Sequence, residues 1–348
     1  MSAAAAENMT SKDASTAGGG CTIDLSIVIV NWNTRDVLAA CLRSVVDNLA
    51  GLRAEIFVVD NASMDGSQAM VREQYPEVRL IENTENRGFA PANNQALRLA
   101  RGHHVLLLNS DTLVLGDVLA QSVRYVEAHP AVGVMGCRVL NEDRSLQRTC
   151  LRYPSVFNMF LMTAGVSNFK WPRFCGREHM IHWRRDNERE VDVVSGCYMV
   201  VRRAALDQVG LLDESFFFCG EEADWCRRFR AAGWQLRFAP VGEIIHIGNV
   251  SGQRRGHRRD IMLSEGLIRF LRKHEGRPSA ALAWLLLWGF NASHFLAWRL
   301  IALLTRKAGA RQRSAHFGAV TRDFALAWPK AAANVPAGAE ARTTEGAK

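Results

Sequence analysis

Three apolar segments in the N-terminal half of the chain are each followed by a cluster of amide, carboxylate and hydroxyl side chains. The clusters are Asn31-Trp32-Asn33, Asp60-Asn61-Ala62-Ser63 and Asn109-Ser110-Asp111. Taken singly, each cluster is best explained as a helix cap or a turn, which Asn, Asp and Ser favour. If all three lie at the same edge of a sheet, they instead line the crevice in which an open α/β sheet binds its ligand.

The sequence offers no glycine-rich loop for binding phosphates. Neither GxGxxG nor GxxxxGK[ST] occurs in it. A nucleotide would therefore be held by carboxylates and amides at its base and ribose, with a divalent cation on its phosphates. Asp111 is the candidate ligand for that cation, because Mg²⁺ and Mn²⁺ prefer hard oxygen donors.

Short apolar strands and amphipathic helices alternate along this half of the chain. The expected strands are 25–30, 55–59, 78–81 and 104–108, and the expected helices are 36–49, 66–75, 91–101 and 117–128. Pro91 would occupy the first position of its helix. The alternation predicts an α/β fold with a doubly wound, mostly parallel central sheet.

The following part of the chain is less regular. Strands are expected at 132–135, 191–194, 198–201 and 235–239, with helices starting at Arg203 and Glu222, the second ending before Gly233. Residues 153–189 show little periodicity and are interpreted as a long functional loop.

The two ends of the chain differ from the middle. Residues 1–22 are rich in Ala, Ser, Thr and Gly and contain no apolar run typical of a signal peptide, so we expect a disordered leader. The chain has eight scattered cysteines and no CxxC pair, which favours reduced thiols in the cytoplasm over disulfides or a zinc site.

The C-terminal part is basic and contains an apolar run. From Gly252 onward there are 17 Lys and Arg against 6 Asp and Glu, whereas the rest of the chain has a net charge of −3. Residues 280–304 are apolar and rich in Trp, but polar residues interrupt them before they reach the roughly 18 residues of a membrane span. We expect residues 251–310 to form helices on an anionic membrane surface, and residues 311–348 to form a basic, flexible tail. The alternative is a helical hairpin packed on the domain or on a second subunit.

Several motifs resemble the family-2 inverting glycosyltransferases, and in particular their bacterial rhamnosyltransferase-like branch. They occur in order at residues 26–33, 58–67, 86–90, 108–111, 195–197, 213–225 and 246–248. The resemblance covers about residues 25–275 and implies a GT-A fold at 23–250, with a nucleotide-binding half at 23–130 and an acceptor half at 131–250.

The resemblance also implies roles for individual residues. Asp60 would bind the nucleotide base or ribose, Arg87 and Gly88 would lie near the diphosphate, and Asp111 would bind the metal. His246 matches a position that either completes the metal site or is structural. The other donor-side candidates are Asn31, Asn33, Asn61 and Asn109, and the acceptor-side candidates are Ser195, Gly196, Glu221, Asp224 and Trp225.

The sequence departs from the family pattern in two places. Asn109 stands at the first position of the metal-binding DxD motif, which leaves Asp111 as its only carboxylate. The family's Glu-Asp pair is Glu221-Glu222 here, so the inferred general base is Glu222. An inverting transfer needs one base near the acceptor hydroxyl and a cation on the leaving diphosphate. The acidic residues after position 220 also suit a helix N-terminus, and Arg228 can pair with Asp224 four residues away.

These observations predict a membrane-associated sugar transferase on the cytoplasmic face of the inner membrane. The donor would be a dTDP- or UDP-sugar, with rhamnose as the candidate sugar, and the acceptor a lipid-linked or polysaccharide hydroxyl. A sugar nucleotidyltransferase is disfavoured because no glycine-rich loop follows the first strand. A non-catalytic scaffold would not need Asp60, Asp111 and Glu222 together. The apolar run within the basic region argues against a nucleic-acid partner.

Overall fold

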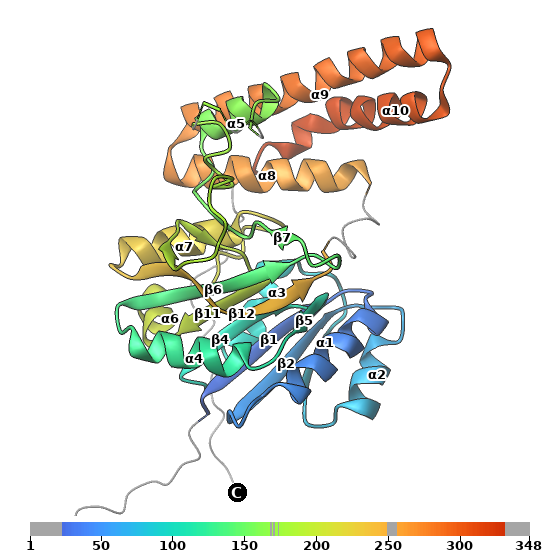
Figure 1. Cartoon of the computed structure of the whole chain (residues 1–348). Helices are drawn as coiled ribbons and strands as arrows, with labels where there is room; N and C mark the ends of the chain where they lie inside the picture. The colour runs from blue at the N-terminus through green and yellow to red at the C-terminus, as the bar shows by residue number, and fades with distance from the viewer. Residues whose placement is uncertain (1–22, 168, 170, 173, 249–255, 331–348) are drawn as a thin grey trace, which may run out of the picture.

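A mixed sheet forms the centre of the molecule (Figure 1). The computed structural model describes residues 23–330 except 168, 170, 173 and 249–255, so the predicted leader and residues 331–348 lie outside the described part. The main strands are β1 (Leu25–Asn31), β2 (Ala54–Asn61), β3 (Arg79–Asn83), β4 (His104–Asn109), β5 (Thr112–Val114), β6 (Val132–Leu140), β11 (Tyr198–Arg202) and β12 (Gln235–His246). Short pairings add β7 (Leu146–Gln147), β8 (Cys150–Leu151), β9 (Arg189–Glu190) and β10 (Val193–Val194).

The strand order is β3-β2-β1-β4-β11-β6-β12-β5. The first four strands are parallel, β11 is antiparallel to both of its neighbours, and β6 and β12 are again parallel. In β1, Val28 packs into one core while Ile27 and Ile29 pack into the core on the opposite face. Burial of both faces explains why this strand reads as a continuous apolar run.

Helices cover both faces of the sheet, as a doubly wound fold requires. One face carries α1 (Arg35–Asp47), α2 (Ser67–Gln74) and α4 (Val118–Ala128). The other carries α3 (Phe89–Leu97), α6 (Arg203–Val209) and α7 (Glu221–Ala231). The prediction for α3 was wrong at its start, because the helix begins two residues before Pro91.

A further helical layer lies beyond α7 (Figure 1). It contains α8 (His257–His274), α9 (Arg277–Thr305), α10 (Ala308–Asp323) and a 3-10 turn, η2 (Phe324–Ala327), and α9 and α10 form a hairpin. Helix α5 (Val156–Thr163), inside the segment predicted as a long loop, packs against α9. The prediction of a flexible tail is wrong for residues 311–327, because these residues are helical and bury Val320 and Phe324.

The polar interruptions in the apolar run do not break α9. Asn291 donates a hydrogen bond to the carbonyl of Leu287 at 2.7 Å, and Ser293 donates to that of Phe290 at 2.8 Å, so their polar groups are satisfied within the helix. In the described part of the chain, α9 is the one helix with the length and apolar composition to cross a membrane. Length and composition alone do not distinguish a span from one helix of a packed hairpin.

Candidate active site

The ends of β1 and β2 form the first part of the site. Asn31 donates from Nδ2 to Asp60 Oδ2 at 2.8 Å, and Gln68 Nε2 and the backbone N–H of Ser63 donate to Asp60 Oδ1, both at 2.8 Å. Asp60 is buried and held in one orientation by these three donors. The two strands pair in register at Asn31 and Asp60, which explains why both side chains reach the same place.

Two of the predicted donor-side amides have partners within the protein. Asn33 accepts from the backbone N–H of Met64 at 2.7 Å, and Asn61 donates to the carbonyl of Gly88 at 3.0 Å. These contacts join the loops that follow β1, β2 and β3. We therefore assign Asn33 and Asn61 to shaping the crevice.

Gly88 lies where two loops meet. Its φ is +89°, and a Cβ on it would come within 2.7 Å of the carbonyl oxygen of Phe217. Phe89 N–H donates to that same oxygen at 3.2 Å, which ties the loop to the segment leading into α7. The neighbouring Arg87 side chain is exposed, so it is free to face a ligand.

The ends of β4 and β12 bring the predicted metal residues together. His246 Nε2 lies 3.2 Å from Asp111 Oδ1 and 3.1 Å from Asn109 Nδ2. Gln147 Oε1 lies 2.7 Å from His246 Nδ1. Because an amide oxygen only accepts, Nδ1 carries a proton, and Nε2 is the nitrogen that faces Asp111 and Asn109.

This arrangement fits a divalent cation. An imidazole nitrogen and a carboxylate oxygen 3.2 Å apart can both bind one cation, because adjacent ligands of an octahedral Mg²⁺ are about 3 Å apart. Gln147 fixes the imidazole as outer partners of metal-binding histidines do, and nothing in the sequence around it marked it for this role. The described residues contain no group of three His, Cys, Asp or Glu that could hold a metal alone, so other ligands would be phosphate oxygens and water.

The candidate base stands at the N-terminus of α7. The backbone N–H of Gly196 donates to Glu222 Oε1 at 3.2 Å, and a Cβ on Gly196 would come within 2.9 Å of that oxygen. Glu222 is partly exposed, and desolvation by the surrounding protein raises its pKa even though backbone N–H groups favour the charged form. Ser195 precedes Gly196 in the loop between β10 and β11.

Glu221 lies in a different environment from Glu222. It is 3% exposed, and its Oε2 has no hydrogen-bond partner among the described residues. Burial raises its pKa well above the usual value, and the charge of Glu222 adds to this effect.

Cys197 connects the base to the metal pair. It follows Gly196, and its carbonyl accepts from the backbone N–H of Asn109 at 3.3 Å. Burial raises the pKa of its thiol to about 12, with further contributions from the charges of Glu222 and Asp111. Both carboxylates therefore lie near one buried residue, although they are more than 100 positions apart in sequence.

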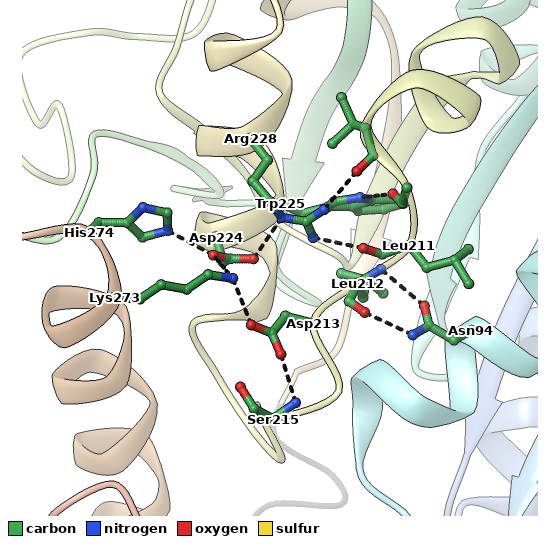
Figure 2. A network of polar contacts seen from close by, with 12 residues as sticks. Asn94, Leu211, Leu212, Asp213, Ser215, Asp224, Trp225, Arg228, Lys273 and His274 are labelled. Atoms are coloured by element: carbon green, nitrogen blue, oxygen red, sulfur yellow. Dashed lines mark hydrogen bonds and ion pairs between the residues drawn. The ribbon is translucent and has the colours of Figure 1, made fainter. Parts of the chain in front are cut away.

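Asp224 is buried within a cluster of charged groups (Figure 2). It accepts from Arg228 Nε at 3.0 Å, His274 Nε2 at 2.7 Å and Lys273 Nζ at 2.7 Å, and Lys273 also contacts Asp213 Oδ2 at 2.6 Å. Burial opposes ionisation, but the hydrogen bonds from His274 and Lys273 outweigh it and lower the pKa of Asp224 to about 2.

Trp225 is also fully buried, and its indole N–H donates to the carbonyl of Gly210 at 2.8 Å (Figure 2). The prediction placed Asp224 and Trp225 on the acceptor side. Their burial excludes direct contact with an acceptor, and we assign both to holding α7 in place. The expected pairing of Arg228 with Asp224 is confirmed.

Helix α8 supports the turn before the base, a contact that was not predicted from the sequence. A Cβ on Gly266 of α8 would come within 2.0 Å of the carbonyl oxygen of Cys219, and one on Gly220 within 2.8 Å of the carbonyl oxygen of Gly266. A glycine inside an otherwise regular helix is a signal of such close approach.

The chain is similar in sequence to known glycosyltransferases. The model of the family described as "Glycosyl transferase family 2" matches residues 26–210, more than half of the chain. An N-acetylglucosaminyl-diphospho-decaprenol L-rhamnosyltransferase of Mycobacterium tuberculosis is 28% identical over 235 residues, covering 64% of this chain and 75% of that protein. Rhamnosyltransferase WbbL of Escherichia coli is 27% identical over 168 residues, covering 46% of this chain and 60% of the relative.

Solved structures with a GT-A fold are similar as well. A mannosyltransferase from Pyrobaculum calidifontis in complex with GDP-Man and Mn²⁺ superposes with a TM-score of 0.52 at 18% identity, covering 88% of this chain and 86% of that one. GalNAc-T7 with UDP, GalNAc and Mn²⁺ gives a TM-score of 0.53 at 17% identity, covering 72% and 48%. The expected GT-A fold is confirmed, and the chain belongs to glycosyl transferase family 2.

Proposed function

We propose that this glycosyltransferase is a metal-dependent, inverting enzyme that transfers a sugar, with rhamnose as the candidate, to a lipid-linked or polysaccharide hydroxyl. The observation that carries the proposal is the placement of Glu222 and the Asp111–His246 pair around Cys197. One group can accept a proton and the other can hold a cation, and an inverting transfer needs these two functions.

Glu222 is the proposed general base. It would take the proton from the acceptor hydroxyl as that oxygen attacks the anomeric carbon and the bond to the diphosphate breaks. The Gly196 N–H orients its carboxylate, and the lack of a side chain on Gly196 leaves room for it. Ser195 and Gly196 then line the acceptor side of the crevice.

Asp111 and His246 are the proposed metal ligands, with Asn109 beside them. A Mg²⁺ or Mn²⁺ ion would neutralise charge on the departing nucleoside diphosphate. The Mn²⁺ ions in both structural neighbours support the choice of a divalent cation. Asp60 and Asn31 would bind the base or ribose, and Arg87 would approach the diphosphate from the loop held by Gly88.

The donor and acceptor are proposed from the relatives. Two of them are rhamnosyltransferases, and the name of the mycobacterial one specifies a diphospho-decaprenol acceptor. The proposed donor for residues 23–130 is a nucleotide sugar of the dTDP or UDP type, as the motifs imply, and a polyprenyl-diphosphate-linked sugar is the favoured acceptor for residues 131–250.

The helical layer is proposed to lie on the cytoplasmic face of the inner membrane. Large apolar side chains of α9 are exposed, namely Leu282, Leu285, Trp288, Leu296, Leu300, Ile301, Leu303 and Leu304. A lipid-linked acceptor is held at the membrane surface, so this face would bring the enzyme to its substrate.

An assay of nucleoside diphosphate release against a panel of nucleotide sugars tests the function. We expect release to require Mg²⁺ or Mn²⁺, to stop in EDTA and to resume when the cation is restored. Asp111→Ala should remove activity while the circular dichroism spectrum and Tm stay close to those of the wild type. Full turnover in EDTA would contradict the metal assignment. If no nucleotide sugar in the panel yielded free nucleoside diphosphate, the proposed donor class would be wrong.

A further inference from the structure

The α9–α10 hairpin has an unusually one-sided charge. Between Gly276 and Arg322 the sequence contains seven Lys and Arg and no Asp or Glu. Most surface helices mix both signs, so such a stretch is typical of a surface that meets an anionic partner.

Three of these cations converge on one groove between the helices, which we call the arginine groove. Arg299, Arg306 and Arg311 line it together with Phe295, Leu303 and Ser314, and its volume is about 850 Å³. The Arg299 guanidinium lies 5.8 Å from the centre of the Phe295 ring. Among the described residues, no carboxylate lies within 4.0 Å of any of the three guanidinium groups.

The chemistry of the groove suits a phosphate group. Guanidinium donors match phosphate oxygens in pairs, and Ser314 adds a hydroxyl to the same groove. Three arginines without acidic partners repel one another, and an anion between them would remove that repulsion.

The apolar side chains next to the groove indicate where the phosphate comes from. Leu303, which lines the groove, is 70% exposed, and Leu300 and Leu304 on the same helix are 58% and 76% exposed. A soluble phosphate compound would leave these side chains in water, whereas a phospholipid offers acyl chains to them beside its phosphate.

We propose that the arginine groove binds the phosphate group of an anionic membrane phospholipid and so fixes the orientation of the hairpin on the membrane. This inference rests on the membrane association proposed above. It goes beyond that proposal because it predicts a defined phosphate site. General attraction between a basic surface and an anionic membrane requires no such site.

A charge-matched pair of variants distinguishes a defined site from general attraction. The groove variant is Arg299→Gln/Arg306→Gln/Arg311→Gln, and the control is Arg277→Gln/Lys307→Gln/Arg322→Gln, in exposed positions of the same hairpin that do not line the groove. Both full-length proteins lose three positive charges. Binding is measured by sedimentation with vesicles of phosphatidylglycerol in phosphatidylcholine, after Tm measurements show that both variants are folded.

We expect the groove variant to bind these vesicles about tenfold more weakly than the control, because general attraction scales with charge alone and is equal for both. Equal losses on phosphatidylglycerol vesicles would overturn the proposal.

A second arm tests for a soluble ligand. Binding of glycerol 1-phosphate to the wild type but not to the groove variant, without vesicles, would assign the groove to a soluble phosphate compound and overturn the lipid assignment. Neither arm contains a sugar donor, so failure of the proposed transferase function would show only in the nucleoside diphosphate assay.

Discussion

The two adjacent carboxylates at the start of α7 differ in exposure and in hydrogen bonding. Glu222 is partly exposed and accepts from Gly196, whereas Glu221 is buried with one oxygen lacking a partner among the described residues. A base must be accessible to the acceptor hydroxyl, and of the two carboxylates Glu222 is the accessible one.

We therefore expect Glu222→Gln to lower kcat roughly 10²–10⁴-fold, the usual effect of losing a general base. Donor binding should change little, because the nucleotide is proposed to lie near Asp60 and the metal pair. Burial raises the pKa of Glu222, so the ascending limb of the wild-type pH profile of kcat/KM should lie above pH 4.5. Steady-state kinetics across pH measure both effects.

Glu221→Gln is the matched control. Gln resembles the protonated acid that burial favours at this position, so most of the activity should remain. Glu222→Asp should keep partial activity if the loop adjusts to the shorter side chain. An inactive Glu221→Gln beside an active Glu222→Gln would assign the base to Glu221, and two active variants would place the base outside this pair.

At the scale of elements, the charged cluster around Asp224 joins three parts of the chain (Figure 2). Asp224 lies on α7, Lys273 and His274 lie on α8, and Asp213 lies on the loop before α7. The cluster fixes the helix that carries the proposed base against the helical layer. Gly266 of α8 adds a close backbone contact with Cys219, just before α7.

Asp224→Asn should lower the free energy of unfolding by about 2–3 kcal/mol at neutral pH, because it removes the anion that His274 and Arg228 contact and one of the two anions that Lys273 contacts. The folded-state pKa is lowered from 3.8 to about 2, so the carboxylate stabilises the fold above pH 3.8 and loses this effect as pH falls towards 2. The difference in free energy of unfolding between the wild type and the variant should therefore decrease as the pH falls from 3.8 to 2. Urea unfolding from pH 7 down to pH 2 measures it.

Asp207→Asn is the control for this prediction. Asp207 forms an exposed i,i+4 pair with Arg203 at 4.0 Å, and its loss should change stability by less than about 0.5 kcal/mol. Equal effects of the two substitutions would contradict a stabilising role for the buried cluster.

At the scale of the whole molecule, the helical layer is integrated with the catalytic domain. Val320 of α10 and Phe324 of η2 belong to the same core as Phe270 of α8 and Trp225 of α7. Truncation before Pro278 would expose this core, so it would test folding as much as membrane binding. Substitution of exposed side chains is the sharper experiment.

Leu296→Ser/Leu300→Ser/Leu304→Ser should weaken vesicle binding at least about tenfold, since each inserted leucine contributes up to roughly 1.5–3 kcal/mol. The three side chains are exposed, so Tm should change little. Leu99→Ser, at a 45% exposed position two residues after the end of α3, is the control and should bind vesicles as the wild type does. Unchanged vesicle binding by the triple variant, together with loss of a dimer on gel filtration, would favour packing of the hairpin on a second subunit.

The alternation of strands and helices could be predicted from the sequence alone. So could the carboxyl ends of the strands at which polar side chains gather. Both are local properties: a run such as 25–30 is apolar because a central parallel strand is buried on both faces, and Asn31 and Asp60 follow directly from strand ends. The motif order also identified the family, which the match over residues 26–210 confirms.

Which polar residues share a site depends on how distant segments pack in the tertiary structure. Glu222 and Asp224 are two positions apart, yet successive residues of a helix point about 100° apart, so one reaches Gly196 while the other is enclosed by Lys273 and His274 of α8. Gln147 and Gly266 contact site residues from distant segments, and no local pattern indicates which segment each of them meets. Helix α10 was not predicted, because its sequence has few apolar positions. Contacts with distant segments stabilise it, through burial of Val320 against the rest of the helical layer.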